Sequence, residues 1–281
     1  MTDPAAEDAK RIKTMKLYSH VDRVYNELKE LGYGLTDQLK VEDLSRVDQY
    51  HYFGTQAVQE AIDDLKINSS FRILDIGSGI GGPARYIAQK TGCHITAVEL
   101  QEDLNTVATD LTKRCNLQDN ITHVCGDFLQ ADYGSESFDL IVSWLTYLHI
   151  PDKEKLFENC WYHLKKGGKM FAADFFESQP FDSAEIEKLS SAVYASDIPS
   201  KERYISLLES AGFKHIKFVD ETEKWTDFVK SRHEEYVANK TRHVRVHNEE
   251  VYAEQEYFFC VVRKLFGGGH LGGCNVTADK V

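Results

Sequence analysis

Residues 71–82 read FRILDIGSGIGG, and this stretch decides the fold that we predict for the chain. Ile73, Leu74 and Ile76 form an apolar run typical of a buried strand, which glycines interrupt before a helical pattern at residues 83–91. Glycine permits a turn with positive φ, and its missing side chain lets a ligand touch the backbone beside the free N–H groups of a helix N-terminus. The stretch therefore predicts a binding site for a flat, polar small molecule.

Beyond this stretch, apolar runs of strand length alternate with helical patterns. The strand-length runs are residues 93–99, 121–125, 138–143 and 169–176. The helical patterns between them are residues 104–115 and 152–164. Such alternation predicts an α/β protein whose parallel sheet has helices on both faces and binds ligands beyond the carboxyl ends of its strands. Two further strands are expected at residues 214–220 and 256–265, on either side of a charged helical stretch.

Two acidic residues after later strands make the predicted ligand more specific. Glu99 ends the second strand-length run, and Asp127 follows the third. Together with the GxGxG spacing and Asp75 before it, they make residues 71–169 similar to the class I S-adenosylmethionine-dependent methyltransferases. In that family the glycine turn passes the methionine part of the cofactor, while the two acids bond the ribose hydroxyls and the adenine amino group. The resemblance implies that the cofactor-binding residues are Asp75, Gly77, Ser78, Gly79, Gly81, Glu99, Leu100, Asp127, Phe128 and Ser143.

The same resemblance refines the predicted architecture. It implies a Rossmann-like, seven-stranded, mostly parallel sheet, with an N-terminal helical lid and an insertion after the fifth strand. We expect the lid and a substrate-pocket segment in residues 1–54, and one amphipathic helix within it, because residues 11–28 have apolar positions at helical spacing. The methyltransferase domain is expected in residues 55–266, with the lid insertion at about 177–200, and a flexible glycine-rich tail in residues 267–281.

Composition narrows the classes of partner. The chain has 281 residues and a formal net charge of -12, which argues against a nucleic-acid-binding protein and favours a cationic small substrate. No apolar run is long enough to cross a membrane, and the first residues lack the apolar stretch of a secretion signal, so we expect a cytoplasmic protein. The six cysteines are scattered, so neither a disulfide framework nor a metal site is expected. The oligomeric state stays open.

His149, after the fourth strand, is our candidate for proton transfer. Methyl transfer needs an aligned nucleophile in a dry site, and an amine that arrives protonated also needs a base, a role that suits histidine near neutral pH. Residues 138–160, FDLIVSWLTYLHIPDKEKLFENC, resemble phosphoethanolamine N-methyltransferases, and residues 74–88 also resemble sarcosine/dimethylglycine and sterol methyltransferases. In the phosphobase enzymes a histidine at this position pairs with an N-terminal tyrosine to orient and deprotonate the amine.

Aromatic residues supply the partner of His149 and the expected acceptor pocket. Tyr18, Tyr25 and Tyr50 compete for the partner's role, which we assign to Tyr18. Where the phosphobase enzymes place an arginine that helps to hold the phosphate, this chain has Trp144, whose π face suits a cation. The predicted substrate-binding residues are Gln49, Tyr50, Tyr52, Trp144 and Tyr147.

These residues favour N-methylation of a small amine or amino acid, with His149 as base or orienting residue. Two alternatives stay open within the same resemblance: C-methylation of a sterol or other lipid, and a phosphoethanolamine-type N-methyltransferase. A nicotinamide-dependent dehydrogenase would use the same sheet, but it would leave Asp127 without a role. A third reading is a non-catalytic, cofactor-binding partner of another enzyme.

Overall fold

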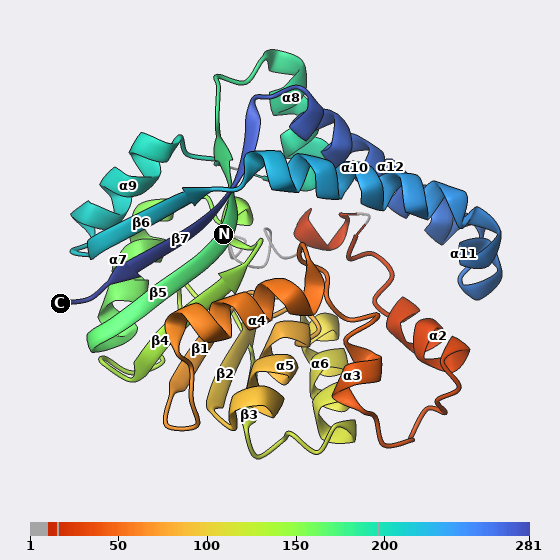
Figure 1. The fold of residues 1–281 in the computed structure, drawn as a ribbon, viewed down its shortest axis with the longest axis horizontal. Helices are drawn as coiled ribbons and strands as arrows, with labels where there is room; N and C mark the ends of the chain where they lie inside the picture. The colour runs from red at the N-terminus through yellow and green to blue at the C-terminus, as the bar shows by residue number, and fades with distance from the viewer. Residues whose placement is uncertain (1–10, 16, 196) are drawn as a thin grey trace, which may run out of the picture.

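One seven-stranded sheet organises the chain. The computed structural model describes residues 11–15, 17–195 and 197–281. In that part of the chain the strand order is β3-β2-β1-β4-β5-β7-β6 (Figure 1). The strands are β1 Arg72–Ile76, β2 His94–Glu99, β3 Ile121–Cys125, β4 Phe138–Trp144, β5 Leu164–Glu177, β6 Lys214–Asp220 and β7 Leu271–Asp279. β1 to β5 run parallel and β7 runs antiparallel between β5 and β6, so the predicted Rossmann-like, mostly parallel sheet is confirmed.

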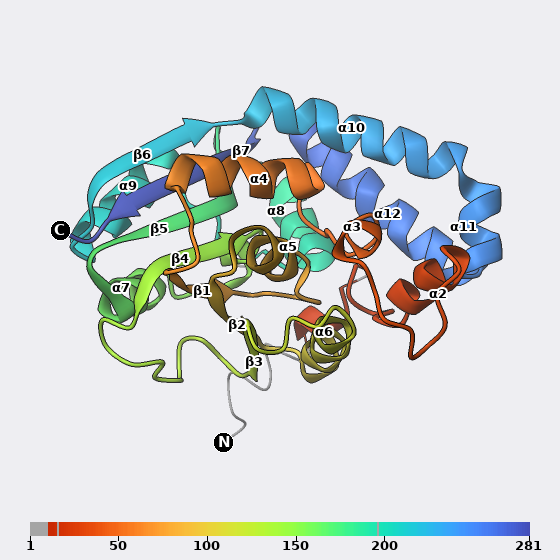
Figure 2. The same ribbon diagram turned by 60° about the horizontal axis from the view of Figure 1, so that its bottom comes forward.

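Helices cover both faces of the sheet (Figure 2). They are α2 Arg23–Glu30, α3 Val41–Leu44, α4 Gly54–Leu65, α5 Gly82–Thr91, α6 Glu102–Arg114, η1 Tyr147–His149, α7 Lys153–His163, α8 Ser183–Lys188, η2 Leu189–Val193, α9 Lys201–Ser210, α10 Thr222–Ala238, α11 Lys240–Val246 and α12 Glu249–Gly267. Ile73 packs in an apolar cluster with α4 and α5, and the next residue, Leu74, packs in a cluster with α7 and α9. Successive strand residues point to opposite faces, so burial of both faces produces the continuous apolar runs from which β1, β2 and β4 are predictable, whereas the edge strand β3 buries only Ile121.

The N-terminal segment departs from the single helix predicted at residues 11–28. Residues 11–13 are helical, but turns follow them and helix α2 begins only at Arg23. Met15 packs in the same apolar cluster as α5, whereas Val24 and Leu28 pack with α3 and α6 in another cluster. The chain has to bend between these two clusters, so one straight helix cannot bury all of the regularly spaced apolar residues.

The apolar run at residues 256–265 is helical, and the prediction of a strand there is wrong. It belongs to α12, whose buried residues recur at helical spacing from Val251 through Phe258 to Leu265. α10 lies beside α12, and α11 joins their far ends, near α2 (Figure 1). No helix within the described residues is long and apolar enough to cross a bilayer.

The glycine-rich tail is the strand β7, so the prediction of a flexible segment at residues 267–281 is also wrong. β7 pairs with β5 along its whole length and with β6 on its other side. A Cβ at Gly272 would lie 2.3 Å from the ring of Phe176, and one at Gly273 would lie 2.2 Å from the ring of Trp225. These glycines therefore make room for aromatic rings against the sheet.

Candidate functional site

The carboxyl ends of β1, β2 and β3 open on a cavity of about 210 Å³, which we call the first cavity. Its lining contains six of the residues predicted to bind a cofactor, which are Gly77, Gly79, Glu99, Leu100, Asp127 and Phe128. Parallel strands end at the same edge of a sheet, so residues from three separate sequence segments meet there.

The glycine turn forms one wall of the first cavity. Gly77 has φ +71° and Gly79 has φ +55°, values that side chains rarely adopt. A Cβ at Gly77 would also lie 2.2 Å from the side chain of Thr146. The N–H groups of Gly77 and Ser78 donate to the carbonyl of Val98 at 2.9 and 3.0 Å, which ties the turn to the end of β2. The bare backbone is thereby held against the cavity.

Glu99 and Asp127 present carboxylates to the first cavity from two strand ends. Glu99 accepts the N–H of Gly79 on Oε2 at 2.8 Å and the N–H of Gln101 on Oε1 at 2.9 Å. Each oxygen keeps a further lone pair, so the pair can accept two hydroxyl groups of a ligand. Asp127 accepts the N–H of Leu129 on Oδ1 at 2.9 Å, which orients it in the same way.

Asp75 is the most perturbed carboxyl group of the site. It is 1% exposed, and neither of its oxygens has a hydrogen-bond partner among the residues that the structure describes. Burial, together with the charge of Glu99, raises the pKa of Asp75 to about 7. The hydroxyl of Ser78 is also buried without a partner in the described part of the chain. Together they suit a cationic, hydrogen-bond-donating group of a ligand.

A second cavity adjoins the first. Its lining includes Tyr50, His51, Tyr52, Asp75, Ser78, Trp144, Phe175 and Arg232. The residues that line both cavities are Tyr18, Gly77, Gly79 and His149. The rings of His51 and Trp144 lie 5.0 Å apart, and within the described residues His51 Nδ1 and Trp144 Nε1 are buried without partners. The second cavity is thus aromatic, with several polar atoms left for a ligand.

His149 stands where the two cavities meet. It is 9% exposed, and its Nδ1 lies 3.2 Å from the carbonyl oxygen of Tyr194. A carbonyl only accepts, so Nδ1 carries the proton and Nε2 carries the lone pair. Burial lowers the pKa of His149 to about 4, which keeps the ring neutral at pH 7. The ring of Tyr18 lies edge-on at 6.4 Å, so the predicted pair is brought together.

Four predicted site residues line neither cavity. The Tyr147 hydroxyl lies 3.7 Å from Cys160 Sγ, in the apolar cluster of the opposite sheet face, so its prediction as a substrate-binding residue is wrong. Tyr147 and His149 are two residues apart in η1, and that spacing turns their side chains to different sides. The remaining three are Gln49, Gly81 and Ser143.

These three residues support the site from behind. Gln49 donates to Asp48 Oδ1 at 2.7 Å, and the Ser143 hydroxyl donates to the carbonyl of Ile76 at 3.1 Å. Gly81 lies against the guanidinium of Arg85, which a Cβ there would approach to 2.8 Å. Their predicted contact with a cofactor or substrate is therefore not supported by the geometry.

Residues on α10 and α12 complete the second cavity, and the sequence analysis missed them. Arg232 comes from α10 and Phe258 from α12. The charged pattern of α10 is typical of a solvent-facing helix, and the apolar run within α12 predicts a strand. No local pattern therefore indicates that Arg232 or Phe258 belongs to a binding site. Long-range packing of the two helices brings them to the strand ends.

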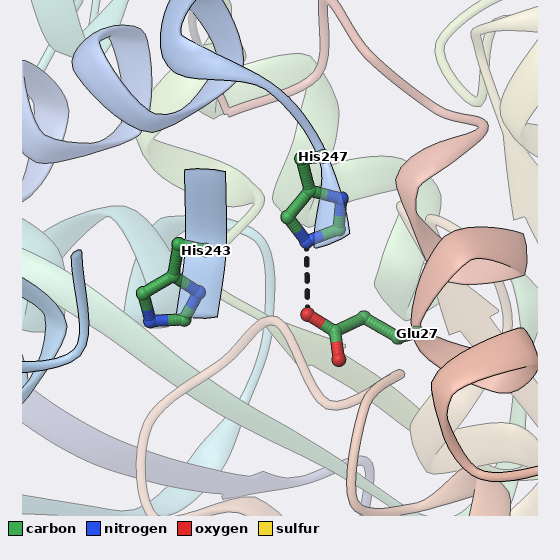
Figure 3. A group of neighbouring side chains, drawn as sticks. All are labelled: Glu27, His243 and His247. Atoms are coloured by element: carbon green, nitrogen blue, oxygen red, sulfur yellow. Dashed lines mark hydrogen bonds and ion pairs between the residues drawn. The ribbon is translucent and has the colours of Figure 1, made fainter. Parts of the chain in front are cut away.

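One group of side chains elsewhere has the composition of a metal site. Figure 3 shows Glu27, His243 and His247, whose donor atoms lie within 4.8 Å of one another. His247 Nε2 lies 2.9 Å from Glu27 Oε1, but the guanidinium of Arg242 also pairs with this carboxylate and lies 3.5 Å from His243 Nδ1. A protein cation thus occupies the position between the donors. We interpret the group as an ion-pair network that joins α2 to α11.

Comparison with known proteins agrees with this geometry. Residues 73–168 match a family model described as a methyltransferase domain. The chain is 29% identical over 191 residues to phosphoethanolamine N-methyltransferase 1 of Zea mays, covering 66% of this chain and 37% of that protein. It is 29% identical over 168 residues to the glycine/sarcosine/dimethylglycine N-methyltransferase of Actinopolyspora halophila, covering 60% of this chain and 30% of that protein.

A solved structure extends the likeness to nearly the whole chain. Phosphoethanolamine N-methyltransferase 2 of Haemonchus contortus, in complex with phosphomonomethylethanolamine and S-adenosylhomocysteine, matches with a TM-score of 0.80 at 18% identity. The match covers 99% of this chain and 61% of that one, so the chain spans less than two thirds of the solved structure and little more than a third, or less, of the other two proteins. At this identity the match establishes the fold. Residues 73–168 therefore match a methyltransferase domain, and the chain has the fold of these methyltransferases, as its glycine turn and two acids predicted.

Proposed function

We propose that this chain is an S-adenosylmethionine-dependent methyltransferase that methylates the nitrogen of a small amine or amino acid. One observation carries this function: buried polar atoms that have no hydrogen-bond partner among the described residues gather in the lining of the second cavity. They include both oxygens of Asp75, the hydroxyl of Ser78, Nδ1 of His51 and Nε1 of Trp144. Folded proteins rarely leave such groups unpaired unless a ligand or water satisfies them.

The first cavity fits the nucleoside part of the cofactor. Glu99 would accept the two ribose hydroxyls, and Asp127 would accept the adenine amino group at the other end. Asp75 and Ser78 would hold the ammonium group of the methionine part. They lie beside the glycine turn, whose bare backbone leaves no room for a Cβ at Gly77. When bound, S-adenosylmethionine supplies the activated methyl group; the protein aligns the acceptor and excludes water.

His149 would take the proton of the amine through Nε2. An ammonium has no lone pair, so the acceptor has to be deprotonated before it attacks. Burial keeps His149 neutral, and the bond from Nδ1 to Tyr194 fixes the ring orientation. Tyr18 would orient the same amine, and Tyr50, Tyr52 and Trp144 would surround it with aromatic faces that attract a cation.

The remaining assignments follow from the same site. The N-terminal segment up to residue 54 would act as a lid, because Tyr18 lines both cavities. A small-molecule enzyme with six free thiols suits the reducing cytoplasm, and a net charge of -12 disfavours a nucleic acid as substrate. The apolar side chains of Phe175, Val193 and Phe258 favour C-methylation of a lipid as the second candidate.

Two measurements test this function. Calorimetry with S-adenosylhomocysteine should show binding, and the same titration with NAD should show none. Radiolabelled S-adenosylmethionine should then transfer its methyl group to at least one member of a panel of glycine derivatives, ethanolamines, histidine-type amines and sterols. Methylation of a sterol alone would favour the second candidate. Absence of S-adenosylhomocysteine binding would refute the methyltransferase assignment itself.

A further inference from the structure

Arg232 is a half-buried cation that has no counterion among the described residues. It lines the second cavity from α10, with its guanidinium carbon 4.8 Å from the ring centroid of Tyr52 and 4.5 Å from that of Phe259. Its Nε and Nη2 are buried and have no hydrogen-bond partner among the described residues. Two donors of a planar fork are therefore unused.

No carboxylate in the described part of the chain forms an ion pair with Arg232. Buried Arg85 differs, because it pairs with Asp48 at 2.9 Å. Burial lowers the pKa of Arg232, and only the phenol of Tyr52 opposes that shift. Burial of a charge without a partner is destabilising, and contact with aromatic faces offsets only part of this cost. The residual cost would be removed by an anionic ligand.

Resting on the methyltransferase function proposed above, we propose that Arg232 binds a compact oxyanion, carboxylate or phosphate, on the methyl acceptor. Arginine matches both groups with two parallel hydrogen bonds. Trp144 stands where the resembled enzymes place an arginine that helps to hold the phosphate, and Arg232 supplies a cation to the cavity from a different element. The acceptor is then a zwitterion, with its anion at Arg232 and its amine beside His149.

The cofactor also carries a carboxylate, so its binding has to be measured separately. Arg232 lines the second cavity together with Asp75 and Ser78, so the carboxylate of the cofactor competes with the acceptor for this guanidinium. An anion supplied by the acceptor predicts that Arg232→Met leaves the affinity for S-adenosylhomocysteine within about twofold of the wild type, whereas a larger loss would assign Arg232 to the cofactor. Methionine keeps a long apolar side chain against Tyr52 and Phe259, so it removes the charge with little loss of packing.

Matched acceptor pairs give the decisive comparison. Turnover of the 281-residue chain is measured with glycine against methylamine and with phosphoethanolamine against ethanolamine. Arg232→Met should lower kcat/KM for the preferred anionic acceptor by at least about 30-fold and change kcat/KM for its anion-free counterpart less than threefold. Arg232→Lys, which keeps the charge but loses the fork, should fall between. The preferred pair also tells a carboxylate from a phosphate acceptor.

Controls separate this role from folding and from failure of the proposed function. Arg263→Met on α12 breaks a pair with Glu234 at 3.2 Å and should change none of these values. Equal losses for anionic and anion-free acceptors, or loss of S-adenosylhomocysteine binding, would overturn the assignment of Arg232. If no amine is methylated, the binding of acetate and of inorganic phosphate to the protein is measured by calorimetry. Binding that is lost in Arg232→Met supports the anion site. Absence of binding to the wild type, or binding that persists in the variant, refutes it.

Discussion

Asp75→Asn should make the cofactor-free protein less sensitive to pH. The pKa of Asp75 is raised from 3.8 to about 7 by burial and by the charge of Glu99. Between these values the unfolded chain has released the proton and the folded chain still holds it, so the free energy of unfolding falls as pH rises. A gap of about three units at about 1.4 kcal/mol per unit costs about 4 kcal/mol in total. Asparagine cannot ionise, so it does not incur this cost.

Urea unfolding of the wild type and of Asp75→Asn measures this effect. Between about pH 5 and about pH 8, the wild type should lose about 3 kcal/mol more than the variant. The comparison uses the two slopes, because the unpaired amide of asparagine adds a penalty of about 1 to 3 kcal/mol that does not depend on pH. Parallel pH profiles would refute the raised pKa and with it the account of an uncompensated buried carboxyl group.

Cofactor binding provides an independent check on Asp75. If the ammonium of the methionine part pairs with this carboxylate, binding at about pH 6 has to release the proton that Asp75 holds. Affinity of the wild type should therefore rise with pH up to about 7, by at most about tenfold per unit. Calorimetry in buffers of different ionisation enthalpy measures the number of protons released on binding. Asp75→Asn should bind the cofactor more weakly and should release fewer protons, because it lacks the proton of Asp75. Equal proton release in both proteins would contradict the pairing.

Three further substitutions test the remaining parts of the site. His149→Ala should lower turnover at least about 100-fold, the scale of a positioned base, while S-adenosylhomocysteine affinity stays nearly constant; unchanged turnover in steady-state assays would remove His149 from the mechanism. Glu99→Ala should instead weaken S-adenosylhomocysteine binding roughly 100-fold in calorimetry, because each hydrogen bond to a charged group contributes about 1.5 to 3 kcal/mol. Binding within threefold of the wild type would exclude the contact between Glu99 and the ribose. Gly77→Ala should lower the melting temperature or abolish cofactor binding, because the new Cβ would lie 2.2 Å from Thr146 at a positive φ. Gly267→Ala should be neutral, because a Cβ there meets nothing within 4 Å. Equal effects of the two substitutions would refute the close approach of Thr146 to the glycine turn.

The part of the fold that depends on local patterns was predictable. β1, β2 and β4 are buried on both faces, so each is an apolar run whose limits lie within one or two residues of the prediction. The glycine turn, Glu99 and Asp127 were equally accessible, because the carboxyl ends of parallel strands share one edge of the sheet. In these cases the residues near in sequence are also the residues that determine the structure.

The failures share a different cause. Residues 256–265 form an apolar run that is compatible with either a strand or a buried helix, and only packing against α10 decides between them. Gly272 and Gly273 suggest flexibility until the rings of Phe176 and Trp225 occupy the space above them. Tyr147 was placed in the pocket with His149, although a 3₁₀ turn directs the two side chains differently. Each outcome depends on a neighbour distant in sequence or on the exact turn geometry.

The same distinction separates recognition of the cofactor from recognition of the acceptor. The first cavity is built from turns that directly follow β1, β2 and β3, so a short motif is sufficient to specify it. The second cavity takes Tyr18 from the N-terminal segment, Trp144 from β4 and Arg232 from α10, segments that only the folded chain brings together. A change of acceptor therefore needs no change in the glycine turn or in Glu99. Relatives that share the motif can therefore differ in substrate, and under the anion site proposed above Arg232 is more informative about the acceptor than the whole of residues 71–82.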